Sequence, residues 1–138
     1  ATDLDVFGHN VETVRRLTPH LRDARADYDQ SLDVLSYLAE RCGGRQVKSG
    51  LMVGLGETTR EIGETLADLR AAGVDLGKIG QYLRPDKRAV PVRQYVSPEA
   101  FRELATQAEE MGFGGVVAGP LVRSSYHAAA MYARSCGS

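Results

Sequence analysis

The chain has 138 residues, a length that fits one domain or part of a larger one. Its hydrophobic fraction of 43% and charged fraction of 25% are typical of a globular protein. The net charge of -1 argues against a nucleic-acid-binding protein, and no apolar run reaches the roughly 18 residues of a membrane span.

The N-terminal segment has no initiator methionine, no basic leader and no apolar signal core. We therefore expect the chain to be part of something longer. Cys42 and Cys136 lie far apart and in no paired motif, so they predict free thiols rather than a disulfide or a zinc site.

The first half of the chain predicts two strands and two helices. A short apolar run at 4–7 is typical of a buried strand, and a polar loop follows it. Apolar residues from Tyr28 to Cys42 recur at helical spacing. Residues 47–55 form the clearest strand, and the Thr58 and Glu61 capping-box pattern begins the next helix.

The second half repeats this order. Residues 76–83 predict a strand, and residues 84–96, with two prolines and four basic residues, predict an excursion loop. Ser97 caps the next helix. Residues 114–119 predict the last strand, and an alanine-rich helical tail follows Ser125. The alternation indicates a parallel α/β fold, either an open sheet or part of a barrel.

Polar clusters follow every predicted strand. Parallel α/β folds bind ligands at the carboxyl ends of their strands, so these clusters are expected at one rim. They comprise His9, Asn10 and Glu12; Gly54 to Thr58; Gln81, Tyr82 and Leu83; and Arg123 to Tyr126.

Each cluster also has a simpler interpretation. His9 and Asn10 fit an ordinary turn and cap, and Ser124 or Ser125 fits the N-cap of the tail helix. The Gly54-x-Gly56 pair lacks the third glycine of a dinucleotide fingerprint. The residues alone thus predict a ligand-binding rim and no particular reaction.

Four phrases nevertheless carry a resemblance to a known family. They are "DVFGHNVETV" (5–14), "KSGLMVGLGET" (48–58), "IGQYLRP" (79–85) and "GPLVRSSYHA" (119–128). In this order, over nearly the whole chain, they closely resemble the C-terminal portion of lipoyl synthase, a radical S-adenosylmethionine enzyme.

The resemblance implies an open (βα)6 barrel of TIM type, of which residues 1–138 would be the C-terminal half and a single partial domain. It implies insertion of two sulfurs at C6 and C8 of an octanoyl chain on a lipoyl-carrier protein. The implied cofactors are S-adenosylmethionine and two 4Fe-4S clusters, one that cleaves it to a 5′-deoxyadenosyl radical and an auxiliary one consumed as the sulfur source.

The same resemblance implies the site residues. Those expected to contact S-adenosylmethionine are Asn10, Glu12, Lys48, Gly54, Gly56, Glu57, Gln81, Tyr82 and Leu83. Ser125, with Ser124 as the second choice, is the expected fourth ligand of the auxiliary cluster, and Arg123 would lie beside it as a charge and gate. No catalytic side chain is assigned.

The family's two cysteine triplets lie upstream of the matching region and are absent from this chain. We therefore expect the chain by itself to hold neither cluster and to be inactive. The alternatives are another radical S-adenosylmethionine sulfurtransferase such as a biotin synthase, or a domain that binds a ligand or carrier without chemistry.

The implied partners are octanoylated carriers, namely the glycine cleavage H protein and the lipoyl domains of 2-oxoacid dehydrogenase E2 subunits. Neither nucleic acid nor a membrane is expected as a partner. The basic residues Arg84, Lys87, Arg88 and Arg93 fit an acidic carrier or a solvated loop equally well. The expected compartment is the bacterial cytoplasm, with an organelle matrix as the alternative.

Overall fold

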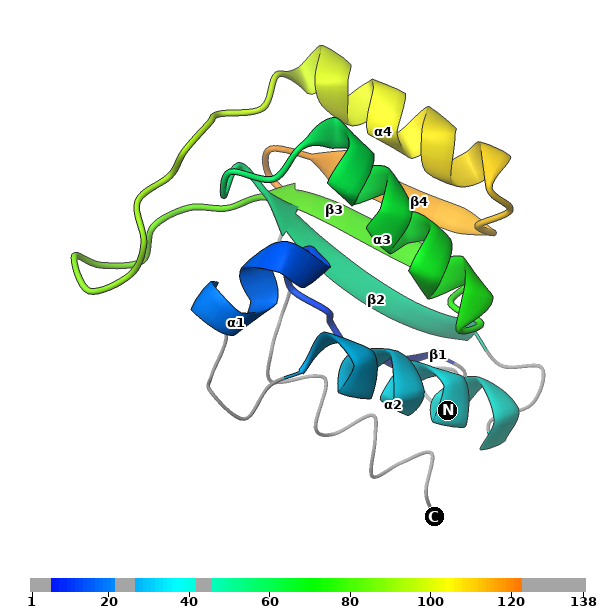
Figure 1. Cartoon of the computed structure of the whole chain (residues 1–138). Helices are drawn as coiled ribbons and strands as arrows, with labels where there is room; N and C mark the ends of the chain where they lie inside the picture. Colours follow the sequence, from blue (N-terminus) through cyan, green and yellow to red (C-terminus); the bar gives the residue numbers. More distant parts are fainter. Residues whose placement is uncertain (1–5, 22–26, 42–45, 123–138) are drawn as a thin grey trace.

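Strands and helices alternate along the chain in the computed structural model, which describes residues 6–21, 27–41 and 46–122 (Figure 1). Cys42, Cys136 and the predicted tail helix lie outside these residues. The elements are β1 (Val6–Gly8), η2 (Arg15–Leu17), α1 (Thr18–Leu21), α2 (Tyr28–Arg41), β2 (Gln46–Val53), α3 (Thr59–Ala71), β3 (Leu76–Gln81), α4 (Pro98–Glu110) and β4 (Gly115–Gly119).

The four strands form one parallel sheet in the order β1-β2-β3-β4. In the register, Lys48 pairs with Leu76, and Lys78 pairs with Val117. Sequential parallel neighbours, each followed by a helical connection, form the repeating unit of a TIM-type barrel. The predicted α/β class is therefore confirmed, and the sheet is that of part of an open barrel.

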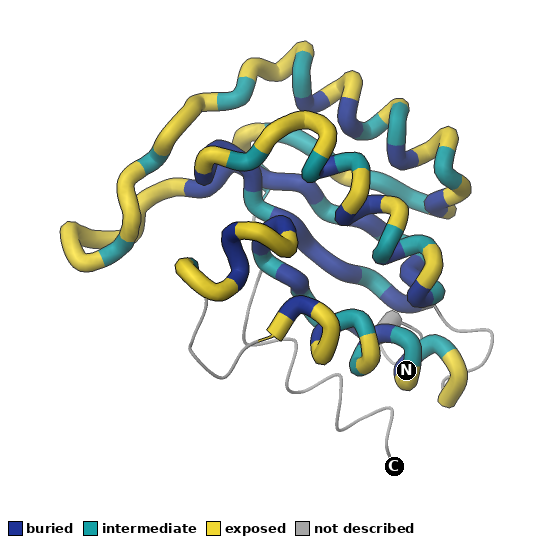
Figure 2. The backbone as a smooth tube through the Cα atoms, viewed as in Figure 1, coloured by how far each residue is buried: buried dark blue, intermediate teal, exposed yellow. Residues whose placement is uncertain are grey.

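The two faces of the sheet differ. Side chains from alternate positions, such as Leu51 and Ile79, are buried under the helices, where Phe101 of α4 is fully buried too. Figures 1 and 2 show the helices along this side, with the buried positions on the strands and on the helix surfaces that meet them. We call the opposite side the helix-free face; it carries Lys48, Gly50, Met52, Lys78, Gly80, Val117 and Gly119.

The predicted helix starts are confirmed in detail. The Thr58 hydroxyl accepts the Glu61 backbone N–H at 3.1 Å, and the Glu61 carboxylate accepts the Thr58 N–H at 2.8 Å. This reciprocal pair is the capping box that begins α3. Ser97 caps α4 by accepting the Ala100 N–H at 3.1 Å.

One helical segment was not predicted. The stretch after β1, expected as a polar loop, contains η2 and α1. These two turns are too short to show an apolar period, yet they bury Leu17 and Thr18 against the core. Strands β2 and β3 also end two residues earlier than predicted, and for β2 the reason is the left-handed φ of 96° at Gly54, which turns the chain out of the sheet.

Candidate functional site

The polar clusters predicted from the sequence share one edge of the sheet. All neighbouring strands pair in parallel, so the loops after β1, β2, β3 and β4 leave from the same edge (Figure 1). The prediction of a common rim is thus confirmed for the described residues. Arg123, Ser124, Ser125 and Tyr126 lie outside them.

The segment after β1 contains a strained residue. Glu12 has a φ of 72°, the one positive value for a non-glycine residue in the described part of the chain. Its backbone is fixed in this conformation by two hydrogen bonds to β2, from Glu12 N–H to the Gly50 carbonyl at 3.2 Å and from Met52 N–H to the Glu12 carbonyl at 2.9 Å. Such strain costs about 1–3 kcal/mol and is concentrated at functional sites. Glu12 and the neighbouring Asn10 are both half-buried at the rim.

A buried hydroxyl lies beside this strained residue. Thr13 is 1% exposed, and its Oγ1 has no hydrogen-bond partner among the described residues. A buried polar group without a partner costs about 1–3 kcal/mol. Nothing in the sequence distinguishes this threonine from a surface one, and it was not among the predicted site residues.

The glycine turn after β2 is built by its own residues. The Glu57 carboxylate accepts the N–H of Gly54 at 3.0 Å and of Leu55 at 3.1 Å. Gly54 has no room for a side chain, because a Cβ there would lie 2.4 Å from both Gln81 Nε2 and the Gln94 carbonyl oxygen. The protein itself therefore occupies the space on the Cβ side of Gly54, and contact of the Gly54 backbone with a cofactor stays a prediction. Gly56, with a φ of 108°, is exposed.

Arg16 holds the far end of this turn. Its guanidinium donates to the Gly56 carbonyl at 3.0 Å and to both carboxylate oxygens of Glu61 at 2.7 and 3.0 Å. The hydrogen bonds from Arg16 and from Thr58 lower the pKa of Glu61 from 4.5 to about 2. Arg16 thus joins η2 to the start of α3, and the sequence prediction missed it because its partner lies 45 residues away.

The cluster after β3 anchors the excursion loop. The Gln81 amide donates to the carbonyl of Gln94 at 2.9 Å and accepts the Val96 N–H at 2.8 Å. The Tyr82 hydroxyl donates to the Val90 carbonyl at 2.6 Å. Both residues are buried, whereas Leu83 is 48% exposed. Contacts of Gln81 and Tyr82 with a cofactor remain predictions, and in this structure their polar groups hold the loop.

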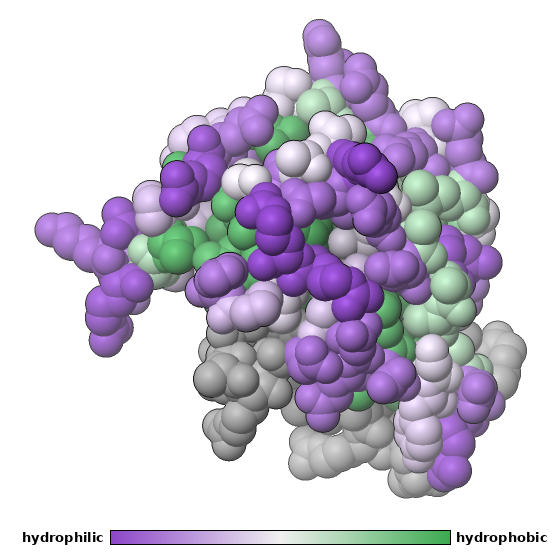
Figure 3. All heavy atoms as spheres, viewed as in Figure 1, coloured by the Kyte–Doolittle hydropathy of each residue, from purple (hydrophilic) through white to green (hydrophobic). Residues whose placement is uncertain are grey.

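Two arginine side chains of the excursion loop are engaged by the loop itself. It projects from the body of the molecule with a hydrophilic tip (Figure 3). The Arg84 guanidinium donates to the carbonyls of Ala89 at 2.9 Å and Lys87 at 2.7 Å. Arg88 pairs with Asp86 at 3.5 Å.

Two lysines lie on the helix-free face. Lys78 on β3 pairs with Gly50 on β2, and Lys48 lies two residues before Gly50 on that strand. The Lys48 side chain runs past Gly8, where a Cβ would lie 2.7 Å from Lys48 Cγ. Partial burial lowers the pKa of Lys78, and the charge of Lys48 lowers it further. Lys78 was not predicted as a site residue. The feature of the sequence that could have indicated it is a charged residue within a predicted strand.

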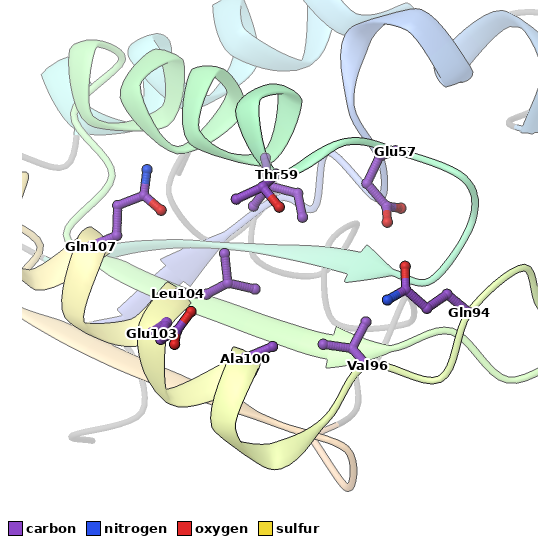
Figure 4. A pocket seen from close by; sticks show the side chains of 9 residues that line it. Glu57, Thr59, Gln94, Val96, Ala100, Glu103, Leu104 and Gln107 are labelled. Atoms are coloured by element: carbon purple, nitrogen blue, oxygen red, sulfur yellow. The ribbon is translucent and has the colours of Figure 1, made fainter.

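A small cavity lies on the opposite, helix-covered side. It has a volume of about 150 Å³ between the first turn of α3 and the first three turns of α4, and Figure 4 shows the Glu57 and Gln94 side chains at its rim-facing end. It therefore shares Glu57 with the glycine turn but not the helix-free face. Its lining residues are Glu57, Thr59, Ile62, Gln94, Val96, Ala100, Glu103, Leu104 and Gln107.

Metal ligands and membrane spans are not found in the described part of the chain. No group of three or more histidine, cysteine, aspartate or glutamate side chains is placed there to hold a metal ion. Among these same residues, no helix is long and apolar enough to cross a membrane.

Comparisons with known proteins agree with the motifs. No family model matches the chain. It is 50% identical to mitochondrial lipoyl synthase of Branchiostoma floridae over 132 residues, which are 96% of this chain and 35% of that protein. It is 52% identical to lipoyl synthase of Flavobacterium psychrophilum over 128 residues, covering 93% and 43% respectively.

An archaeal relative is similar to the same degree. Lipoyl synthase of Pyrobaculum calidifontis is 57% identical over 130 residues, covering 93% of this chain and 44% of that protein. The chain thus spans less than half the length of each of these relatives. Over nearly its whole length, the resemblance of this chain to the lipoyl synthases is confirmed.

Proposed function

We propose that this chain is the C-terminal portion of the barrel of a lipoyl synthase, a single partial domain over residues 1–138. Its activity is then the insertion of sulfur at C6 and C8 of a protein-bound octanoyl chain. The observation that carries the proposal is identity of 50–57% to lipoyl synthases over more than nine-tenths of the chain. These relatives favour lipoyl synthase over a biotin synthase.

We propose the described rim as the surface that binds S-adenosylmethionine. When bound beside a 4Fe-4S cluster, this cofactor supplies the 5′-deoxyadenosyl radical that abstracts hydrogen from the octanoyl chain. The half-buried Asn10 amide can donate or accept a hydrogen bond, and the Glu12 carboxylate can accept one, from the ribose or the methionyl group. Two backbone hydrogen bonds to β2 hold Glu12 in its strained conformation. The exposed Leu83 can contact the adenine ring, and the exposed Gly56 leaves its backbone accessible.

Other residues predicted to contact the cofactor support this surface through hydrogen bonds within the protein. Glu57, Gln81 and Tyr82 make hydrogen bonds that shape the loops. Because Gly54 has no side chain, the Gln81 amide and the Gln94 carbonyl can lie against its backbone. We propose that these residues position the rim, while Lys48 on the helix-free face meets the carboxylate of the cofactor.

Ser125 is the proposed iron ligand from this chain. An iron–sulfur cluster normally takes thiolate ligands, and a serine oxygen is a harder ligand that dissociates more readily from iron. Such a ligand suits a cluster that gives up its sulfur. The other three ligands of the auxiliary cluster would come from one of the two cysteine triplets that the family carries upstream of the matching region.

The proposed partner is an octanoylated lipoyl-carrier protein. Within the excursion loop, Arg84 and Arg88 are engaged by the loop itself. Lys87 and Arg93 are therefore the side chains we propose for contact with an acidic carrier. The relatives include mitochondrial and apicoplast proteins, so an organelle matrix and the bacterial cytoplasm both remain proposals for the compartment.

A hybrid enzyme tests the function. The 128-residue matching region of the Flavobacterium psychrophilum protein would be replaced by the corresponding part of this chain, and the product reconstituted with iron and sulfide. We expect the hybrid to form lipoyl groups on an octanoylated H protein, measured by mass spectrometry of the carrier.

The unmodified relative is the positive control, and the relative without the matching region is the negative control. A hybrid with a full complement of iron and intact secondary structure that forms no lipoyl group would refute the proposal. The variant Ser125→Ala in the same hybrid should lose sulfur insertion, and unchanged turnover would reject its role as a ligand.

A further inference from the structure

The excursion loop leaves an aromatic side chain, that of Tyr95, in solvent. Tyr95 is 73% exposed, and Leu83 and Val90 of the same loop are exposed as well. Three of the six exposed large hydrophobic residues in the described part of the chain thus belong to this one loop. Single exposed apolar residues are ordinary, whereas several on one projecting segment are typical of an interaction surface.

The backbone on both sides of Tyr95 is fixed by one side chain. The Gln81 amide donates to the Gln94 carbonyl at 2.9 Å and accepts the Val96 N–H at 2.8 Å, so it binds both peptide groups that flank Tyr95. The N–H groups of the two preceding residues both donate to the Gly54 carbonyl, at 2.8 and 3.3 Å. Tyr95 is therefore presented to solvent by a firmly held stretch of the loop.

The side chains beside Tyr95 serve the interior, and that of Tyr95 does not. Gln94 and Val96 line the cavity between α3 and α4 (Figure 4). A partner that binds Tyr95 does not have to order its backbone, because the protein has already done so. Tyrosine has two side-chain torsions, offers a large contact area at low entropic cost, and is enriched among the residues that dominate binding at interfaces.

The same loop is positively charged, although the whole chain has a formal net charge of -1. It carries four basic side chains and one carboxylate, that of Asp86, which pairs with Arg88. The hydrogen bonds of Arg84 go to carbonyl groups and leave its charge in place. Neither Arg84 nor Lys87 nor Arg93 pairs with a carboxylate of the described residues. The exposed ring thus lies in a basic loop.

The position of the loop narrows the choice of partner. Strand β3 pairs with β2 on one side and with β4 on the other, so no further strand can pair beside the loop. The loop projects from the sheet at the rim (Figure 1). A second copy of the chain would present the same positive charge, and like charges disfavour contact between the loops. These features favour an acidic partner that reaches the rim from outside.

We propose that Tyr95 is the apolar anchor of a docking surface for an acidic face of the octanoylated carrier protein, flanked by the charges of Lys87 and Arg93. The ring makes the central contact, while the basic side chains speed association and fix orientation. Tyr95 is thus a specificity-determining residue that recognises the folded carrier rather than the octanoyl chain. This inference rests on the proposed function, in which a carrier brings the octanoyl chain to the rim.

The variant Tyr95→Ala tests the inference, with Tyr37→Ala as its control, because Tyr37 is an exposed tyrosine on α2. In the hybrid enzyme, Y95A should raise KM for octanoylated H protein about 10- to 30-fold, as expected when a dominant interface residue is truncated, with kcat within about twofold. Turnover of a short octanoyl-lysine peptide with uncharged flanking residues should stay unchanged, because it offers the loop no folded surface. Y37A should leave both substrates unaffected. A parallel loss with carrier and peptide in Y95A, or equal KM changes in Y95A and Y37A, would overturn the inference.

A binding measurement needs no cofactor. In calorimetric titrations of the cofactor-free hybrid with octanoylated H protein, Y95A should raise the Kd about 10- to 30-fold, whereas Tyr95→Phe, which keeps the ring, should stay within about threefold. Binding by the unsubstituted hybrid should weaken as salt is added, because exposed charges are screened. A Y95F variant as weak as Y95A, or binding insensitive to salt, would overturn the inference. If the unsubstituted hybrid forms no lipoyl group, the proposed function fails, while these titrations still decide whether Tyr95 binds the carrier.

Two other occupants of this surface would give different results. If Tyr95 lay between two copies of the chain, Y95A would lower the molar mass of the hybrid in sedimentation equilibrium and leave its affinity for H protein unchanged. If the upstream part of the hybrid covered Tyr95, Y95A would lower the melting temperature of the hybrid and again leave that affinity unchanged. Either result would overturn the inference.

Discussion

The loops after β2 and β3 leave neighbouring strands at the same edge but are held in different ways. The short loop, residues 54–58, is closed by its own Glu57 carboxylate. In the long loop, residues 82–97, the Tyr82 hydroxyl donates to the Val90 carbonyl within the loop. The limb that returns to α4 is held from outside the loop by Gln81, the last residue of β3. The two loops meet where the Arg93 N–H donates to the Gly54 carbonyl at 2.8 Å. The short loop is thus closed near the sheet by a side chain of its own, with Arg16 holding its far end, whereas the return limb of the long loop depends on a residue of the neighbouring strand.

Gly54→Ala should have the largest effect because it breaks both loops. A Cβ would lie 2.4 Å from Gln81 Nε2 and from the Gln94 carbonyl, and alanine is strained at a φ of 96°. Overpacking and strain together should lower the free energy of unfolding by about 3 kcal/mol. Urea denaturation would measure this. Gly56→Ala is the control, since its φ is 108° but its nearest contact is 3.7 Å, and it should cost only about 1 kcal/mol. Equal losses would refute the steric argument.

Gln81→Ala should release the long loop alone. It removes the acceptor of the Val96 N–H and the donor to the Gln94 carbonyl, leaving half-buried backbone groups without partners. We expect a loss of about 2 kcal/mol in stability and faster hydrogen exchange at Val96, with exchange at Leu55 unchanged. Gln94→Ala is a matched control, because only the backbone of Gln94 takes part, and it should change stability by less than about 0.5 kcal/mol. Faster exchange at Leu55 in Q81A would show that the closure of the short loop near the sheet depends on the long one.

The sequence predicted what depends on neighbouring residues in the chain. The capping box at Thr58 and Glu61, the Ser97 cap and the strand–helix order all rest on local patterns, and all are confirmed. The common rim followed from parallel pairing alone. The hydrogen bond of Arg16 joins it to Glu61, 45 residues away, and that of Gln81 joins it to Gln94 in an irregular loop. No hydrophobic periodicity in the sequence indicates either contact. The positive φ of Glu12 is likewise imposed by its hydrogen bonds to β2, and not by its residue type.

Glu57→Ala should open the short loop alone. It removes a carboxylate that accepts two backbone N–H groups, from Gly54 and Leu55. Hydrogen bonds to a charged group contribute more than neutral ones, so we expect a loss of about 1.5 kcal/mol. Hydrogen exchange should accelerate at Leu55 and stay unchanged at Val96, the reverse of the Q81A result. Glu57→Gln, which keeps one acceptor oxygen, should recover part of the loss, and a variant with no effect at Leu55 would contradict the closure.

Removing the ion pair at the end of the short loop should have the smallest effect, and that effect should depend on pH. The hydrogen bonds from Arg16 and, after it, from Thr58 lower the pKa of Glu61 to about 2, from its ordinary value of 4.5. The folded chain therefore binds this proton less tightly, so the contribution to stability is complete above about pH 4.5 and is lost as the pH falls toward 2. The pair is at the surface and screened by salt, which limits its contribution to less than about 1 kcal/mol. The free energy of unfolding of the wild type, Glu61→Gln and Arg16→Met would be measured across this pH range. It should depend less steeply on pH in the two variants than in the wild type. If R16M kept the wild-type slope, the low pKa would owe more to the Thr58 cap than to Arg16, and the end of the short loop would be as self-contained as its beginning.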